Sequence, residues 1–135
     1  MESPKKILIV DDENSILITL KSALKRKGVE IITTTRIEEA EYAMKNTFFD
    51  VVLADIRLTG VLGREGLELL SYIRDKSPGT EVIIMTAYGS PEIEQEAYEK
   101  GAYFYFDKPI DLRVLDEQLS KLGIFNNVGI TKSHV

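Results

Sequence analysis

Five short apolar segments divide the sequence, and they restrict the fold more than any other feature does. Segments that are apolar at nearly every position are typical of strands covered on both faces, as in a parallel sheet. They lie at residues 7–10, 29–32, 51–54, 82–85 and 102–106. Glu30 interrupts the second segment, which runs into three threonines, so we expect this strand at an edge of the sheet.

A helical pattern follows each segment. Apolar residues recur every three or four positions after four of the segments: Ile16, Leu17, Leu20 and Leu24; Ile37, Ala40 and Met44; Leu67, Leu70 and Ile73; Leu112, Leu115, Leu119 and Leu122. The fourth helix is expected to begin at Ser90 and Pro91, which supply an N-cap and a first-turn proline, and to end before residue 101. At the other boundaries, we expect Gly28 to end the first helix and Asp111 to cap the fifth, and Thr35 with Glu38 forms a capping-box pattern.

The alternation of five strands with five helices predicts an α/β fold. Crossovers between parallel strands are right-handed, so the helices cover both faces of the sheet. We predict a three-layer, doubly wound (βα)5 domain, flavodoxin-like, with a parallel five-stranded sheet in the order 2-1-3-4-5. The pattern fades after residue 122, so residues 1–122 form the predicted domain, and residues 123–135 form a frayed end, a linker or a short extension.

Composition excludes several kinds of function. The chain has 135 residues, which suits one domain, with no cysteine and a single histidine, His134, near the end. We therefore expect no disulfide, thiolate metal site or histidine-based triad. The net charge of −5 without a basic cluster argues against direct nucleic-acid binding by this domain. No apolar stretch has the length of a membrane span, so we expect a cytoplasmic protein without membrane contact.

Polar residues follow four of the five predicted strands. Asp11 and Asp12 follow the first, Asp55 the third, Thr86 the fourth and Lys108 the fifth. In open parallel sheets, ligands bind beyond the carboxyl ends of the strands, at the point where the strand order reverses. The predicted order gathers all five residues there, although Asp11 and Asp12 are also typical helix-capping acids and Thr86 could simply end a strand.

Charge predicts a divalent cation at this point. Three carboxylates carry −3, and Lys108 together with one Mg²⁺ carries +3. Oxygen ligands of this kind select Mg²⁺ or Mn²⁺ over zinc. Asp55 then has the surroundings of a carboxylate nucleophile for phosphoryl transfer, with Lys108 and the cation neutralising the transferred group and the Thr86 hydroxyl donating to a phosphate oxygen.

Four motifs in order carry a resemblance to a known family. They are ILIVDDE, VVLADIRL, VIIMTAYG and GAYFYFDKPI, each at the end of a predicted strand. Over about residues 4–122 the chain resembles the receiver domain of two-component response regulators. The resemblance implies that Asp55 accepts phosphate from a phosphohistidine on a histidine kinase or histidine phosphotransfer protein, and that Lys108 contacts the phosphate. It also implies that the bond between Lys108 and Pro109 is often cis.

The same resemblance implies a metal site and a switch. Asp12, Asp55 and the backbone carbonyl of Arg57 would ligate Mg²⁺, with Asp11 acting through water. Thr86 and Tyr105 would move together on phosphorylation, although Tyr105 also fits a plain core position. From the aromatic run at residues 103–106 we expect the output to be a partner or a homodimer bound through the face of the fourth helix, fifth strand and fifth helix. Such a protein is a phosphoacceptor rather than an enzyme, with at most weak self-phosphorylation and autodephosphorylation.

The chain departs from the family pattern in three places. Thr59 replaces the usual proline, and the following loop is about three residues longer, beside the expected kinase-docking surface. The aromatic run at residues 103–106 suggests an adhesive partner surface. Arg57 and Tyr88 are bulky and flank the site, which predicts a long-lived phosphoryl group.

Two other functions remain as alternatives. The first is a receiver-like scaffold that is never phosphorylated, although such scaffolds typically lack one of the site residues present here. The second is a Mg²⁺-dependent phosphohydrolase. The dehalogenase-type pattern for that chemistry places two acids as D-x-D on the first strand, whereas here Asp11 and Asp12 are adjacent.

Overall fold

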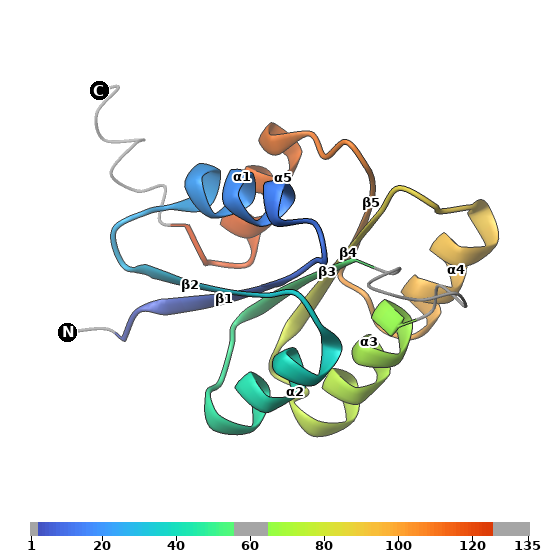
Figure 1. The fold of residues 1–135 in the computed structure, drawn as a ribbon, viewed down its shortest axis with the longest axis horizontal. Coiled ribbons are helices and arrows are strands. Elements are labelled where there is room, and N and C mark those ends of the chain that lie inside the picture. Colours follow the sequence, from blue (N-terminus) through green and yellow to red (C-terminus); the bar gives the residue numbers. More distant parts are fainter. Residues whose placement is uncertain (1–2, 56–64, 126–135) are drawn as a thin grey trace.

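The computed structural model describes residues 3–55 and 65–125. Strands and helices alternate along the chain (Figure 1). The strands are β1 (Lys5–Val10), β2 (Val29–Thr34), β3 (Val51–Asp55), β4 (Glu81–Thr86) and β5 (Phe104–Asp107). The helices are α1 (Asn14–Leu24), α2 (Ile37–Asn46), α3 (Glu65–Lys76), α4 (Pro91–Glu99) and α5 (Leu112–Lys121). Every predicted strand and helix is present, which confirms the α/β class.

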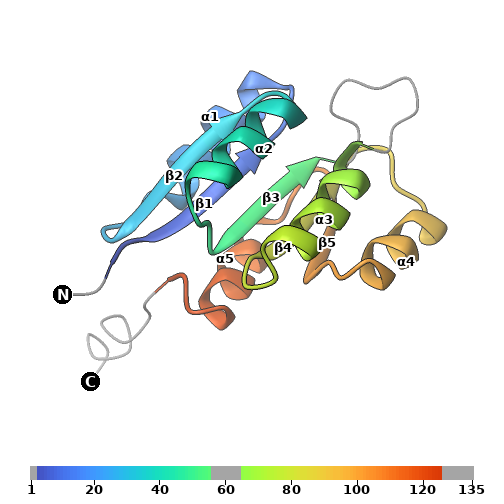
Figure 2. The same ribbon diagram turned by 90° about the horizontal axis from the view of Figure 1, so that it is seen from below.

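The five strands form one parallel sheet in the order β2-β1-β3-β4-β5. Figure 2 shows them side by side and running in the same direction. The predicted flavodoxin-like order and the edge position of β2 are confirmed. The order reverses between β1 and β3, whose carboxyl ends meet where Val10 pairs with Ala54.

Helices cover both faces of the sheet, which makes three layers. Helices α1 and α5 lie on one face and α2, α3 and α4 on the other (Figures 1 and 2). Alternate strand residues enter two separate cores: Ile7 and Ile9 pack with the α1/α5 side, and Leu8 and Val10 with the α2/α3 side. All four are fully buried, because a central parallel strand has no face open to water.

Two helix starts agree with the sequence and one does not. Ser90 accepts a hydrogen bond from the backbone of Ile93, and Asp111 caps α5 through Arg113. At α2, the predicted pairing of Thr35 with Glu38 is wrong. The side chain of Glu39 instead accepts both the backbone N–H and the hydroxyl of Thr35, at 3.1 and 3.2 Å. The acidic partner lies one position later because α2 begins with Arg36 as its N-cap.

The predicted end of α1 is also wrong. The helix ends at Leu24 with an extended Lys25 as its C-cap, so Gly28 does not terminate it. Gly28 instead has φ of +82° in the turn that enters β2, where its carbonyl accepts from Lys5. The glycine is needed for that turn because other residues rarely adopt a positive φ.

Packing continues for a few residues after the end of α5. Gly123 has φ of +80°, and the N–H of Ile124 donates to the carbonyl of Leu119, which closes α5 with a Schellman turn. Ile124 and Phe125 are then buried against the α1/α5 core. Arg26 covers the Phe125 ring at 4.4 Å. The helical pattern missed these residues because they pack after the helix has ended.

The aromatic run of residues 103–106 contributes to the core instead of forming an exposed patch. Tyr105 and Phe106 are buried, and Tyr103 and Phe104 are half-buried against the α1/α5 side. Two half-buried rings thus remain on the edge strand β5, and the expected partner surface there stays a prediction. Arg57, Thr59 and most of the lengthened loop lie outside the described residues. Among the described residues, no helix has the length and apolar character needed to cross a membrane.

Candidate functional site

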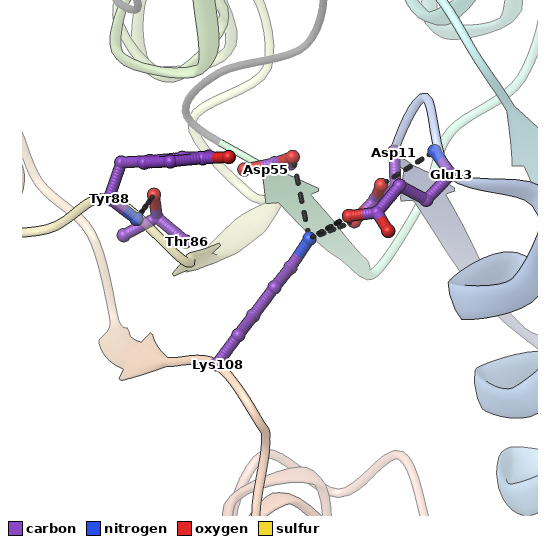
Figure 3. Close-up of polar contacts among 6 residues, drawn as sticks. All are labelled: Asp11, Glu13, Asp55, Thr86, Tyr88 and Lys108. Atoms are coloured by element: carbon purple, nitrogen blue, oxygen red, sulfur yellow. Dashed lines mark hydrogen bonds and ion pairs between the residues drawn. The ribbon is translucent and has the colours of Figure 1, made fainter.

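The carboxyl edge of the sheet gathers the polar residues that the sequence singled out. Asp11 directly follows β1, Asp55 ends β3, Thr86 ends β4 and Lys108 directly follows β5. Figure 3 shows the lysine side chain reaching between the acids on the two central strands. Asp11, Asp55 and Thr86 are almost completely buried, whereas Asp12 is exposed. The parallel sheet therefore builds a charged site from residues far apart in sequence.

Lys108 is the centre of the ion-pair network. Its Nζ lies 2.7 Å from Asp11 Oδ2, 3.4 Å from Asp55 Oδ2 and 3.6 Å from Glu13 Oε1. Burial of the ammonium group acts to lower the pKa of Lys108, but the hydrogen bond to Asp11 and the neighbouring carboxylates outweigh it. The pKa of Lys108 is therefore raised, and the side chain remains a cation.

The backbone around Lys108 fixes where its side chain starts. Its N–H donates to the carbonyl of Thr86 at 2.8 Å, which ties the end of β5 to the end of β4. The bond between Lys108 and Pro109 is cis, as the family resemblance implied. The lysine therefore leaves the sheet next to the ends of β3 and β4 and extends across them toward β1 (Figure 3).

Three carboxylates lie close enough to hold one cation. One oxygen each from Asp11, Asp12 and Asp55 lie within 4.8 Å of one another. Burial, and after it the charges of Asp11 and Glu13, raise the pKa of Asp12. Because Lys108 balances one of the three aspartate charges, the donor set fits a hard divalent cation such as Mg²⁺. Arg57, the fourth ligand implied by the resemblance, lies outside the described residues.

The two acids after β1 do not cap α1. The N-cap of α1 is Glu13, which makes no side-chain capping bond. Asp11 instead accepts the N–H of Glu13 at 2.9 Å while its other oxygen faces Lys108. The contact of Glu13 with Lys108 was not predicted, although its place as the third acid of the DDE run was a signal for it.

Thr86 is oriented by the turn that follows β4. Its Oγ1 accepts the N–H of Tyr88 at 2.9 Å, which leaves the hydroxyl proton available to a ligand. Tyr88 is 63% exposed, and its ring extends toward Asp55 in Figure 3. The loop after β4 therefore places one hydroxyl in the sheet and one aromatic side chain over the site.

Tyr105 lies in β5 with its ring buried, and its hydroxyl donates to Asp107 Oδ1 at 3.3 Å. Burial, followed by the charge of Asp107, raises the pKa of Tyr105 to about 12. The backbone N–H of Tyr105 donates to the hydroxyl of Tyr98 on α4 at 3.1 Å. Neither Asp107 nor Tyr98 was singled out from the sequence, because no local pattern connects them to Tyr105.

Two buried aspartates, an exposed third and a lysine thus meet at the carboxyl edge of a doubly wound sheet. The family model of the response regulator receiver domain matches residues 7–120. The chain belongs to this family, whose members are signalling domains of two-component systems that are phosphorylated on aspartate and generally bind Mg²⁺ at an acidic pocket.

Known proteins agree with this membership. The response regulator protein PilR of Pseudomonas aeruginosa is 36% identical over 85% of this chain and 25% of its own length. The DNA-binding transcriptional regulator NtrC of Salmonella typhimurium is 37% identical over 78% of this chain and 22% of its own length. The chain therefore spans about a quarter of the length of these curated relatives.

Solved structures show the same fold. A CheY-like response regulator receiver domain protein from Methanospirillum hungatei superposes with a TM-score of 0.81 at 36% identity, over 90% of this chain and 95% of that one. The beryllofluoride-activated NtrC4 receiver domain dimer superposes with a TM-score of 0.79 at 30% identity, over 87% of this chain and 94% of that one.

Proposed function

We propose that Asp55 accepts a phosphoryl group from a phosphohistidine on a histidine kinase or histidine phosphotransfer protein. The carrying observation is that Asp55 ends a central strand, is 4% exposed, and has Lys108 Nζ 3.4 Å from its carboxylate. A buried carboxylate held beside a fixed cation is preorganised for an incoming anionic group. The domain would act in the cytoplasm, as response regulators generally do, without contacting nucleic acid itself.

The step is a displacement at phosphorus. An oxygen of Asp55 forms a bond to phosphorus, and the bond from phosphorus to the donor's imidazole nitrogen breaks. The electron pair of that bond returns to the imidazole ring. Lys108 balances charge on the transferred phosphoryl group, and the Thr86 hydroxyl donates to one of its oxygens. Asp11 keeps Lys108 in place through the 2.7 Å ion pair.

Asp12, Asp55 and the backbone carbonyl of Arg57 would hold Mg²⁺, with Asp11 acting through water. When bound, the cation neutralises phosphoryl oxygens and aligns them with the attacking carboxylate. The cluster of three aspartates within 4.8 Å supports this donor set. The same residues would hold Mn²⁺, which shares the preference for oxygen ligands.

Phosphorylation would act as a switch through Thr86 and Tyr105. A phosphoryl group on Asp55 attracts the Thr86 hydroxyl, and the loop after β4 moves with it because Thr86 holds the N–H of Tyr88. Tyr105 and α4 lie at the other end of that loop. The resulting output surface is the face of α4, β5 and α5, where Tyr98 and Leu112 are exposed. That surface would bind an output partner or a second copy of the chain.

Intact mass after incubation with acetyl phosphate tests the proposal. Wild-type protein should gain one phosphoryl adduct with Mg²⁺ and far less in EDTA, whereas Asp55→Ala should gain none. Asp75→Ala is the matched control, because Asp75 is an exposed acid on α3. A folded wild-type protein that binds Mg²⁺ yet gains no adduct would support the unphosphorylated scaffold instead.

Sedimentation velocity addresses the output surface. The proposal expects the phosphorylated protein either to dimerise or to gain affinity for a partner, and Leu112→Asp on α5 to weaken that association. A protein that stays monomeric when fully phosphorylated would leave partner binding as the only output.

A further inference from the structure

Gly89, in the loop between β4 and α4, lies directly against the end of the Tyr105 side chain. A Cβ atom added to Gly89 would overlap the Tyr105 hydroxyl and would lie 3.0 Å from Tyr105 Cζ and 2.8 Å from Asp107 Oδ1. Contacts this short do not occur in folded proteins, so any other residue forces a neighbour to move. Glycine is required here because there is no room for a side chain. Its backbone conformation does not require glycine, since the φ of Gly89 is not positive.

The atom that would have to move most is the hydroxyl of a constrained side chain. The Tyr105 ring is 6% exposed, and its hydroxyl donates to Asp107. The backbone of Tyr105 is also tied to α4 through Tyr98. Because Asp107 is exposed, its carboxylate can turn away. A buried ring has two torsions and must leave its site to clear the overlap.

Another glycine shows that this close approach is specific. A Cβ at Gly79 would lie 3.5 Å from the Phe48 ring, which is an ordinary van der Waals contact. Gly79 has no positive φ. Gly79→Ala therefore makes the same chemical change in a loop that has room for it.

We propose that Gly89 is a positioning residue that allows the Tyr105 ring to lie buried against the β4–α4 loop. The absence of a side chain at residue 89 would thus leave room for the Tyr105 ring and keep the output face in the arrangement seen here. The consequence for signalling rests on the proposed function, because Tyr105 is part of the proposed switch. The steric claim itself does not depend on phosphorylation.

The position of the Tyr105 ring can be measured directly by NMR on protein with labelled tyrosine, assigned with Tyr105→Phe. At neutral pH, Gly89→Ala should increase the relaxation of the Tyr105 ring by a soluble paramagnetic probe several-fold, and Gly79→Ala should leave it unchanged. The Tyr105 phenol should also titrate close to pH 10 in Gly89→Ala instead of near pH 12. A loss of stability alone would not move that titration.

A double-mutant cycle isolates the contact. Tyr105→Leu ends before the atoms that meet residue 89, so the loss of thermal stability caused by Gly89→Ala should largely disappear in that background. An unchanged loss there, or an unchanged ring signal in Gly89→Ala, would overturn the proposal. Acetyl phosphate should still modify Asp55 in Gly89→Ala, so failure of the steric claim is distinguishable from failure of the proposed phosphoryl acceptance.

Discussion

Removing the charge of Asp55 should stabilise the metal-free protein. Asp55 lies within 4.8 Å of both Asp11 and Asp12, and two unit charges at that distance repel by about 3.5 kcal/mol at an effective dielectric near 20. Its attraction to Lys108 at 3.4 Å amounts to about 5 kcal/mol on the same scale. Two repulsions of about 7 kcal/mol together thus exceed one attraction. The difference of about 2 kcal/mol is an upper limit because water screens the exposed Asp12, so we expect Asp55→Asn to gain less than this.

Urea denaturation in EDTA measures this gain, and the same titration in millimolar Mg²⁺ measures its reversal. Wild-type protein should be stabilised by Mg²⁺ more than Asp55→Asn, since the variant has lost one anionic ligand. Asp75→Asn is the control: its carboxylate is exposed beside Lys76, and the change should be close to neutral. If Asp55→Asn were equal to or less stable than wild type in EDTA, the account of a site with excess negative charge would be refuted.

Three further predictions follow from the described contacts. Lys108→Met should destabilise the metal-free protein by about 3 kcal/mol, because it leaves buried Asp11 without its partner, and added Mg²⁺ should recover part of the loss in urea melts; no loss would contradict the network. Ser90→Ala should cost about 1 kcal/mol through the lost cap of α4, whereas Ser90→Thr should retain most of it; equal losses would exclude the capping hydroxyl. Tyr105 has a folded-state pKa of about 12 against an ordinary 10.0, so its contribution is complete below pH 10 and is lost as pH rises toward 12. Wild type should lose about 1.4 kcal/mol between pH 9 and pH 11 relative to Tyr105→Phe, and parallel pH profiles would contradict the buried phenol.

The fold was predictable because each buried central strand corresponds to an uninterrupted apolar segment in the sequence. Such segments predict a parallel sheet. Glu30 interrupts the second segment, and this charge correctly predicted that β2 lies at an edge of the sheet. The boundaries were less predictable. Whether Glu38 or Glu39 meets Thr35 depends on where α2 begins, and Ile124 and Phe125 are buried by tertiary packing that a helical period does not encode.

The site was predictable where it depends on strand ends and charge. Asp11, Asp55, Thr86 and Lys108 meet because parallel strands bring their carboxyl ends to one edge. Contacts between a helix or loop and a strand that it packs against were not predictable. Tyr98 holding the backbone of β5, and Gly89 making room for a phenol 16 positions away, depend on how α4 and its loop lie over the sheet.

Mapping the phosphoryl group to one residue is the most direct test of the central claim. Borohydride reduces an aspartyl phosphate to homoserine, so phosphorylated protein can be reduced, digested and sequenced by mass spectrometry. We expect homoserine at position 55 only, dependent on Mg²⁺ and on the phosphodonor, with Asp11 and Asp12 unchanged. Homoserine at another acid, or an adduct that resists reduction, would contradict the assignment of Asp55 as the phosphoacceptor.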